Sequence, residues 1–159
     1  MCNELMFLLK EEWGDLEAQA SKTGVRGLVC AKTSLDPVAA IEKFKTTLSE
    51  RPYEFRYAMR IIPIQQVTPT DLKEIKRVAN ELASKIQENQ TYRVTVEKRF
   101  TILHTNQLVE AAATDIKAKV DLHKPDYILL IEVLGGFTGI SLLKPSDILG
   151  VVKEKMMPT

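Results

Sequence analysis

The chain has 159 residues, of which 45% are hydrophobic and 27% are charged, and its formal net charge is +1. This is the composition of an ordinary globular protein with a packed core, and it argues against extensive disorder. No run of about 18 apolar residues is present, so the sequence predicts no membrane-spanning helix.

The first 50 residues are predicted to contain two strands and two helices. Residues 5–9 form a short apolar run that is typical of a strand, with a buried helical fragment as the alternative. Residues 13–23 are expected to be helical, and residues 25–32 are expected to form a second strand. Residues 36–48 begin with Asp-Pro and continue with apolar side chains at helical spacing, which predicts a second helix.

The middle of the chain shows a strand–helix–strand pattern. Alternating side chains predict a strand over residues 56–64, although Pro63 indicates its end or an edge position. Thr68 and Pro69 resemble a helix start, and apolar residues at helical spacing continue to Ile86. Residues 92–99 alternate again and predict a strand.

The last predicted elements are one helix and a hairpin. A helix capped by Thr105 or Asn106 is expected to extend towards Val120. Residues 126–133 are almost continuously apolar, which is typical of a strand covered on both faces. The glycines at positions 135 and 136 permit a tight turn into a partner strand over residues 137–143. This order of elements predicts an α/β (α+β) fold.

Recognisable catalytic motifs are missing. The glycine-rich segment at 135–139 matches neither the dinucleotide-binding pattern nor the P-loop, and no nucleophile elbow is present. Asp121 and Asp126 flank His123 in a helix-to-strand connection, where such residues usually cap and turn. We therefore expect a chain that is not an enzyme, although an unrecognised active site remains an alternative.

Cofactors and a secretory route are not predicted either. The two cysteines are too few for a disulfide framework, and they form no zinc-ligand spacing with the two histidines. The N-terminus lacks the basic start and the cleavage site of a signal peptide. The sequence therefore predicts no metal, no cofactor and a cytoplasmic location.

Several segments between residues 56 and 149 resemble, in order, the THUMP domain family. The segments are the strand at 60–64, the helix at 68–85, the strand at 92–99 ending in Lys98-Arg99, the V-D-L-x-x-P-D segment at 120–126, and the closing hairpin at 128–142. The V-D-L-x-x-P-D segment contributes most to the resemblance. It implies a THUMP-like mixed sheet with flanking helices over residues 51–150. A small ferredoxin-like βαβ module at residues 1–50 and a C-terminal tail at 151–159 would complete the chain.

The resemblance also implies a function. THUMP domains are usually fused to tRNA-modifying enzymes and are thought to grip the acceptor end of tRNA, including its 3′ tail. Because no catalytic domain is expected, the chain resembles the stand-alone THUMP proteins. These include the adaptor of the tRNA cytidine acetyltransferase, which makes N4-acetylcytidine. The expected partners are tRNA and a separate modifying enzyme, and the alternative is a protein-interaction module without RNA affinity.

RNA binding requires cations for the phosphates and favours aromatic side chains for the bases. The candidate RNA-binding residues are Arg56, Arg60, Arg93, Lys98, Arg99, Phe100, Lys119, His123, Lys124 and Lys144. Phe100 is the expected stacking residue, whereas Tyr57 and Tyr92 are expected in the core. The cations would converge if the strand at 56–64 lay beside the strand at 92–99. Each cation taken alone is better explained as an ordinary solvated surface charge, whereas the set taken together with the family resemblance favours a binding patch.

Overall fold

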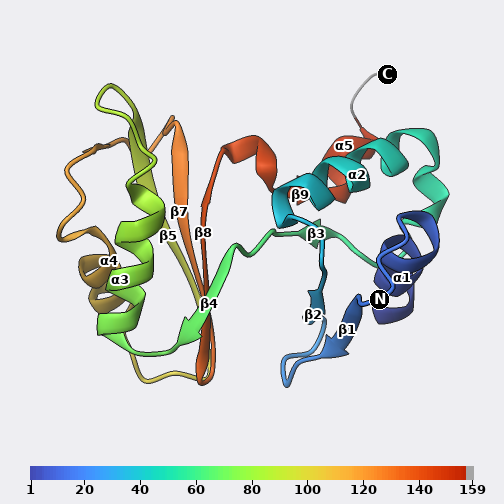
Figure 1. Cartoon of the computed structure of the whole chain (residues 1–159), viewed down its shortest axis with the longest axis horizontal. Helices are drawn as coiled ribbons and strands as arrows, with labels where there is room; N and C mark the ends of the chain where they lie inside the picture. The colour runs from blue at the N-terminus through green and yellow to red at the C-terminus, as the bar shows by residue number, and fades with distance from the viewer. Residues whose placement is uncertain (157–159) are drawn as a thin grey trace. The chain divides into compact units, whose positions relative to one another are not determined.

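The computed structural model describes residues 1–156, which divide into two units (Figure 1). The first unit comprises Met1–Pro63 and the chain from Asp147 onward, and the second comprises Ile64–Ser146. These units differ from the segments 1–50, 51–150 and 151–159 expected from the sequence. Residues 51–63 still belong to the first unit, before the chain enters the second. Residues 147–150 belong to the first unit because the chain returns there after leaving the second.

The first unit combines helices with two small antiparallel sheets. Its elements are α1 (Cys2–Met6), the π-helix η1 (Phe7–Glu12), β1 (Gln19–Lys22), β2 (Val29–Lys32), α2 (Pro37–Glu50), the 3-10 helix η2 (Pro52–Glu54), β3 (Arg60–Ile61), β9 (Leu149–Gly150) and α5 (Val151–Lys155). β1 pairs with β2 and β3 pairs with β9, both antiparallel. The helix α2 was predicted correctly, and the carboxylate of Asp36 accepts the N–H of Ala39 at its start, at 3.0 Å.

The beginning of the chain is helical, so the predicted strand at residues 5–9 is wrong and the alternative is correct. Leu5, Leu8 and Leu9 are all buried, and their spacing places them on one helical face. The predicted helix at 13–23 is also wrong, because these residues turn and enter β1. Since β1 and β2 are consecutive and antiparallel, residues 1–50 lack the βαβ order expected of a ferredoxin-like module.

The carboxylate of Asp15 fixes this hairpin to the unit. It accepts hydrogen bonds from the Thr33 hydroxyl at 2.5 Å and from the hydroxyl and backbone N–H of Ser34 at 2.6 and 2.9 Å. The hydrogen bonds from Ser34 and Thr33 hold the pKa of Asp15 below its ordinary value. Asp15 is thus a buried structural carboxylate.

The C-terminal residues close the core of the first unit. Val151 is buried together with Leu149, and the Lys155 ammonium donates to the Phe55 carbonyl at 2.9 Å. Residues 151–155 of the expected C-terminal tail therefore form a helix of this unit, whereas residues 157–159 of that tail lie outside the described residues. Within residues 1–156, no helix has both the length and the apolar character needed to cross a membrane.

The second unit is a five-stranded mixed sheet with two helices on one side (Figure 1). Its elements are β4 (Gln66–Pro69), α3 (Leu72–Ala83), β5 (Thr91–Arg99), α4 (Thr105–Ala113), β6 (Lys119–Val120), β7 (Tyr127–Leu134) and β8 (Phe137–Leu143). The strand order is β4-β8-β7-β5-β6. β5 is parallel to β7 and β6, whereas β8 is antiparallel to β7 and β4. A mixed α+β fold with a multi-stranded sheet and flanking helices is therefore confirmed.

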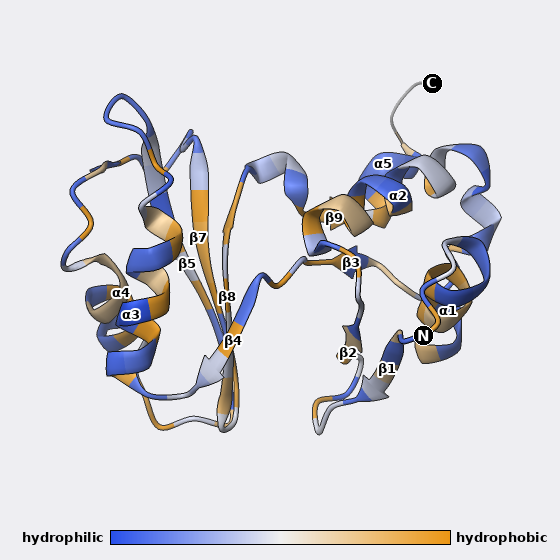
Figure 2. Ribbon diagram, viewed as in Figure 1, coloured by the Kyte–Doolittle hydropathy of each residue, from blue (hydrophilic) through white to orange (hydrophobic). Residues whose placement is uncertain are grey.

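The core of this unit lies between the sheet and the helices. Figure 2 shows the apolar residues of α3 on the side that faces the strands. The buried core residues are Ile75, Val78, Ala79, Leu82, Tyr92, Leu108, Ala112, Leu129, Ile131, Val133, Ile140 and Leu142. Tyr92, Val94 and Val96 of β5 pack into this core, so Arg93 and Arg99 belong to the opposite face.

Several predicted boundaries differ from the structure. The strand at 56–64 is reduced to β3, since Pro63 lacks the N–H that a longer ladder would need. Thr68 is a buried residue of β4 rather than a cap, and Asp71 caps α3 by accepting the N–H of Lys73 at 3.2 Å. His104 is the N-cap of α4, which ends at Ala113 and not near Val120.

Candidate nucleic-acid interface

The predicted binding residues lie in three places. Arg56 and Arg60 belong to the first unit, whereas the others belong to the second. The condition for convergence, a pairing of the strands at 56–64 and 92–99, is not met, because β3 pairs with β9 while β5 pairs with β7 and β6. Within the second unit, Arg93 and Arg99 lie at opposite ends of β5, about 20 Å apart for an extended strand. The ten residues therefore do not form one cluster.

Five basic residues belong to the segments at the end of the sheet where β5 begins. This basic edge consists of Arg93, Lys117, Lys119, His123 and Lys124. Pairing between β6 and β5 places Lys119 opposite Thr91. The chain then stays attached to β5, since the Asp121 N–H donates to the Tyr92 carbonyl at 3.0 Å. The guanidinium of Arg93 donates to the carbonyl of Leu122 at 3.1 Å, which joins the arginine to the same segment.

The V-D-L-x-x-P-D segment builds the turn that displays these cations. The Asp121 carboxylate accepts the backbone N–H groups of His123 and Lys124 at 3.0 and 3.1 Å. These bonds, with Lys124 first, hold the pKa of Asp121 below its ordinary value. Asp126 accepts the N–H and the hydroxyl of Thr91 at 2.8 and 3.2 Å. Both aspartates are thus committed to capping and turning, which confirms the structural interpretation of this segment.

The cations of the basic edge form no salt bridges, although the Asp121 carboxylate lies near enough to attract Lys119 and His123. Within residues 1–156, none of Arg93, Lys117, Lys119 and Lys124 forms an ion pair. The three lysines and His123 are exposed, and Arg93 is half-buried. Each such cation can therefore meet an incoming anion without first breaking an internal salt bridge.

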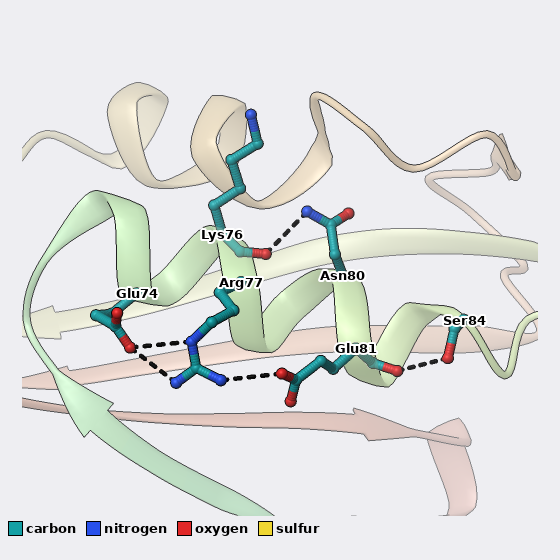
Figure 3. A network of polar contacts seen from close by, with 6 residues as sticks. All are labelled: Glu74, Lys76, Arg77, Asn80, Glu81 and Ser84. Atoms are coloured by element: carbon teal, nitrogen blue, oxygen red, sulfur yellow. Dashed lines mark hydrogen bonds and ion pairs between the residues drawn. The ribbon is translucent and has the colours of Figure 1, made fainter.

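Lys76 and Arg77 on α3 differ in this respect, because both form ion pairs. Arg77 lies between Glu74 and Glu81 and donates to both, with N···O distances of 2.7 and 2.9 Å (Figure 3). The two glutamates raise the pKa of Arg77, with Glu74 the larger cause. Lys76 pairs with Asp115 at 3.0 Å. This helix face therefore has little free positive charge, and the basic edge is the better candidate for phosphate contacts.

The far end of β5 carries the predicted group Lys98, Arg99 and Phe100. Lys98 donates to the Leu103 carbonyl at 3.1 Å, and Arg99 is paired with Glu132 at 3.1 Å. Phe100 is 68% exposed and has a φ of 58°, which is the only positive φ of a non-glycine residue among residues 1–156. A bulky residue in this conformation is strained. The two cations are thus partly engaged, while the aromatic ring is accessible.

The structure also locates two further lysines and the two tyrosines that were expected in the core. Lys144 follows Leu143, which pairs with Ile128, so it lies at the same end of the sheet as the basic edge. Three strand spacings, about 14 Å, separate β8 from β6. Lys117 was missed, and only the alternating K-A-K at 117–119 signals it. Tyr57 is 64% exposed, contrary to the expectation of a core residue, whereas Tyr92 is buried as expected and burial raises its pKa.

Residues 69–143 match the family described as the THUMP domain. The matched range lies inside the second unit and contains α3, α4, the basic edge and the β7–β8 hairpin. THUMP domains are associated with RNA binding and tRNA modification. The family resemblance expected from the sequence is therefore confirmed for this domain.

The similarity to some other proteins extends over more of this chain than residues 69–143. The uncharacterized protein MJ0421 of Methanocaldococcus jannaschii is 25% identical over 152 residues, which are 92% of this chain and 39% of that protein. The crystal structure of PH1313 from Pyrococcus horikoshii has a TM-score of 0.65 and 18% identity, over 94% of this chain and 47% of that one. The crystal structure of TrmN from Thermus thermophilus has a TM-score of 0.57 and 12% identity, over 89% and 41%. This chain spans less than half the length of each, and the structural likeness shows the fold.

Proposed function

We propose that this chain, whose residues 69–143 form a THUMP domain, binds tRNA at its acceptor stem and 3′ end and presents it to a separate modifying enzyme. The observation that carries the proposal is the basic edge, where cations without carboxylate partners surround a turn held by Asp121 and Asp126. Phosphate oxygens need such donors, and arginine and lysine supply them. In this proposal the chain holds RNA in the cytoplasm and catalyses nothing itself.

The chemistry of the basic edge favours a structured RNA over a particular base sequence. Lysine ammonium groups contact phosphates as point charges and carry no sequence information. An RNA helix is recognised mostly by its shape and its phosphates across the wide minor groove. We therefore expect recognition of a folded stem, with the unpaired 3′ nucleotides adding contacts elsewhere. Phe100 is the proposed stacking residue of the second unit, because its ring is accessible and aromatic faces accept any base.

We also propose a candidate for the enzyme partner. It rests on the resemblance to stand-alone THUMP proteins, and the candidate partner is the tRNA cytidine acetyltransferase that forms N4-acetylcytidine. The N4-acetylcytidine content of tRNA, measured after reaction with that enzyme in the presence and absence of the chain, tests this role. A content that the chain does not change contradicts the acetylation role and leaves RNA binding to be judged separately.

Binding to three RNAs tests the proposed substrate. The RNAs are a whole tRNA, the same tRNA without its unpaired 3′ nucleotides, and an unrelated hairpin of equal length. We expect the whole tRNA to bind most tightly in fluorescence anisotropy, and each affinity to fall steeply as salt rises, because released counterions favour binding at low salt. Equal affinity for the tRNA and the unrelated hairpin would contradict acceptor-end recognition. No measurable binding to any of them would contradict RNA binding itself.

A further inference from the structure

We infer that the β1–β2 hairpin of the first unit is a second RNA contact, which binds the phosphate backbone of a paired RNA stem. This basic hairpin comprises residues 19–32 and lies outside the THUMP match at residues 69–143. The inference rests on the proposed RNA-binding function and extends it to a hairpin that contains none of the residues predicted from the sequence to bind RNA.

The basic hairpin concentrates positive charge in an acidic part of the chain. Residues 1–50 contain six lysines and arginines against eight aspartates and glutamates, whereas residues 19–32 contain Lys22, Arg26 and Lys32 and no acidic residue. All three cations are exposed, and none forms an ion pair with any of residues 1–156. An anion can therefore bind them without first breaking a salt bridge.

The strand pairing fixes where the cations lie on the hairpin, which extends away from α2 and α5 of its unit (Figure 1). Lys22 is opposite Val29 at the end of the ladder next to the turn, and Lys32 is opposite Gln19 at the other end. Because opposite residues share a face and neighbours alternate, Lys22 and Lys32 lie on different faces. Arg26 belongs to the turn itself. The hairpin thus offers positive charge on both faces and at its tip.

The turn of the hairpin is ordered and leaves backbone N–H groups free. The Thr23 hydroxyl donates to the Leu28 carbonyl at 2.8 Å and accepts the Val25 N–H at 3.0 Å. Gly27 has a φ of 79°, a conformation that favours glycine. Within the described part of the chain, no group accepts the N–H of Arg26 or of Gly27. Successive free N–H groups in a turn form a concavity that attracts anions such as phosphate oxygens.

The composition of the hairpin favours a polyanion over a protein partner. Protein interfaces are depleted in lysine and depend on large anchors, mostly aromatic residues, methionine and arginine. The hairpin has two lysines, a single arginine and no aromatic residue or methionine. It also contributes none of the large hydrophobic side chains that are exposed in the described chain. A lipid surface would likewise gain from apolar side chains that insert into it.

The absence of aromatic residues also selects the form of RNA. Binding of an unpaired strand gains from bases that stack on aromatic rings, and residues 19–32 contain no such ring. Lysine, arginine and backbone N–H groups contact phosphates without reading a base. An RNA helix is recognised mostly by its shape and backbone. The expected ligand is therefore the phosphate backbone of a helical stem.

The test is the affinity of the full chain for a labelled RNA duplex of about 16 base pairs, the span of a known duplex-binding module. We expect Lys22→Gln/Arg26→Gln to weaken binding on the order of 50-fold at about 0.1 M salt, and to lower the salt slope by about two, because two phosphate contacts are lost. Lys22→Arg/Arg26→Lys keeps both charges and should bind nearly as the wild type does. If the wild type binds and the glutamine variant binds equally well, the inference is overturned while the proposed function stands.

Matched controls separate the hairpin from net charge and from other anionic partners. Lys43→Gln/Lys153→Gln removes two exposed charges from α2 and α5 of the same unit and should leave the affinity close to the wild-type value. An equal loss in this control would overturn the assignment to the hairpin. Phosphatidylserine vesicles or polyaspartate that compete as well as the duplex would overturn the assignment to RNA. No RNA binding by the wild type would contradict both this inference and the proposed function.

The thiol of Cys30 provides a second measurement that removes no charge. Cys30 is exposed and lies opposite Ser21 in the hairpin. A photoactivated cross-linker attached there in the Cys2→Ser variant should cross-link to the RNA duplex. The comparison is the same reagent on Ser49→Cys, an exposed position near the end of α2, in the variant without the two native cysteines. A yield from Cys30 no higher than that from position 49 would overturn the inference.

Discussion

The double variant Lys119→Ala/Lys124→Ala is expected to bind whole tRNA on the order of 50-fold more weakly than the wild type at about 0.1 M salt, if each lysine neutralises one phosphate. Both side chains are exposed and neither forms an ion pair among residues 1–156, so both ammonium groups can contact RNA without breaking a salt bridge. The slope of log affinity against log salt should fall by about two in magnitude. Anisotropy titrations at four salt concentrations measure both quantities.

The matched control for this variant is Lys43→Ala/Lys73→Ala. It removes the same number of exposed lysines from the helices α2 and α3, and it should leave both the affinity and the salt slope close to the wild-type values. If the control loses as much affinity as the basic-edge variant, binding depends on net charge alone. The proposed location would then be wrong.

Ile131→Ala is expected to destabilise the second unit by about 2–5 kcal/mol, as large-to-small changes in a protein core do. Ile131 is fully buried in the middle of β7, where it packs in the core between sheet and helices. It also lies opposite Val96 on β5 and Ile140 on β8, so its loss leaves a cavity at the centre of the sheet. Urea denaturation followed by far-ultraviolet circular dichroism measures the free energy of unfolding.

Ile102→Ala provides the same chemical change on the surface. Ile102 is 94% exposed, so the variant should change the free energy of unfolding by no more than about 0.5 kcal/mol. Equal destabilisation by the two changes would contradict the assigned core. Because the helices and the basic edge are built on this sheet, Ile131→Ala should weaken tRNA binding only at temperatures where the unit unfolds.

Long elements with a strong pattern were predictable from the sequence. The apolar run at 126–133 and the alternation at 92–99 correspond to β7 and β5, and the helix after Asp36 begins where its capping residue indicates. Each of these segments owes its pattern to one buried face, which a sequence records directly. The closing hairpin was likewise signalled by its two glycines.

Short elements and pairings were not predictable. Leu5, Leu8 and Leu9 fit either a strand or one helical face, and a run of five residues cannot decide between them. The partner of β3 is β9, nearly 90 residues later, and local patterns contain no information about such long-range pairing. The convergence of Arg60 with Lys98 and Arg99 was conditional on the strand at 56–64 pairing with the strand at 92–99, and β3 and β5 do not pair.

The basic edge was only partly predictable. Lys119 precedes the V-D-L-x-x-P-D segment and His123 and Lys124 lie within it, whereas Lys117 has no motif of its own. What distinguishes these cations is the absence of carboxylate partners within the described residues, and that property depends on side-chain geometry. The pairing of Arg99 with Glu132 across β5 and β7 is equally invisible without the strand register.

The most direct test of tRNA binding through the basic edge is the reactivity of individual lysines towards an acylating reagent, read by peptide mass spectrometry with and without saturating tRNA. Lys117, Lys119 and Lys124 are exposed in the free chain and should react readily. We expect tRNA to protect these three lysines severalfold while Lys73 on α3 keeps its reactivity. Unchanged reactivity of all three in the presence of bound tRNA, or protection confined to Lys98, would contradict the account.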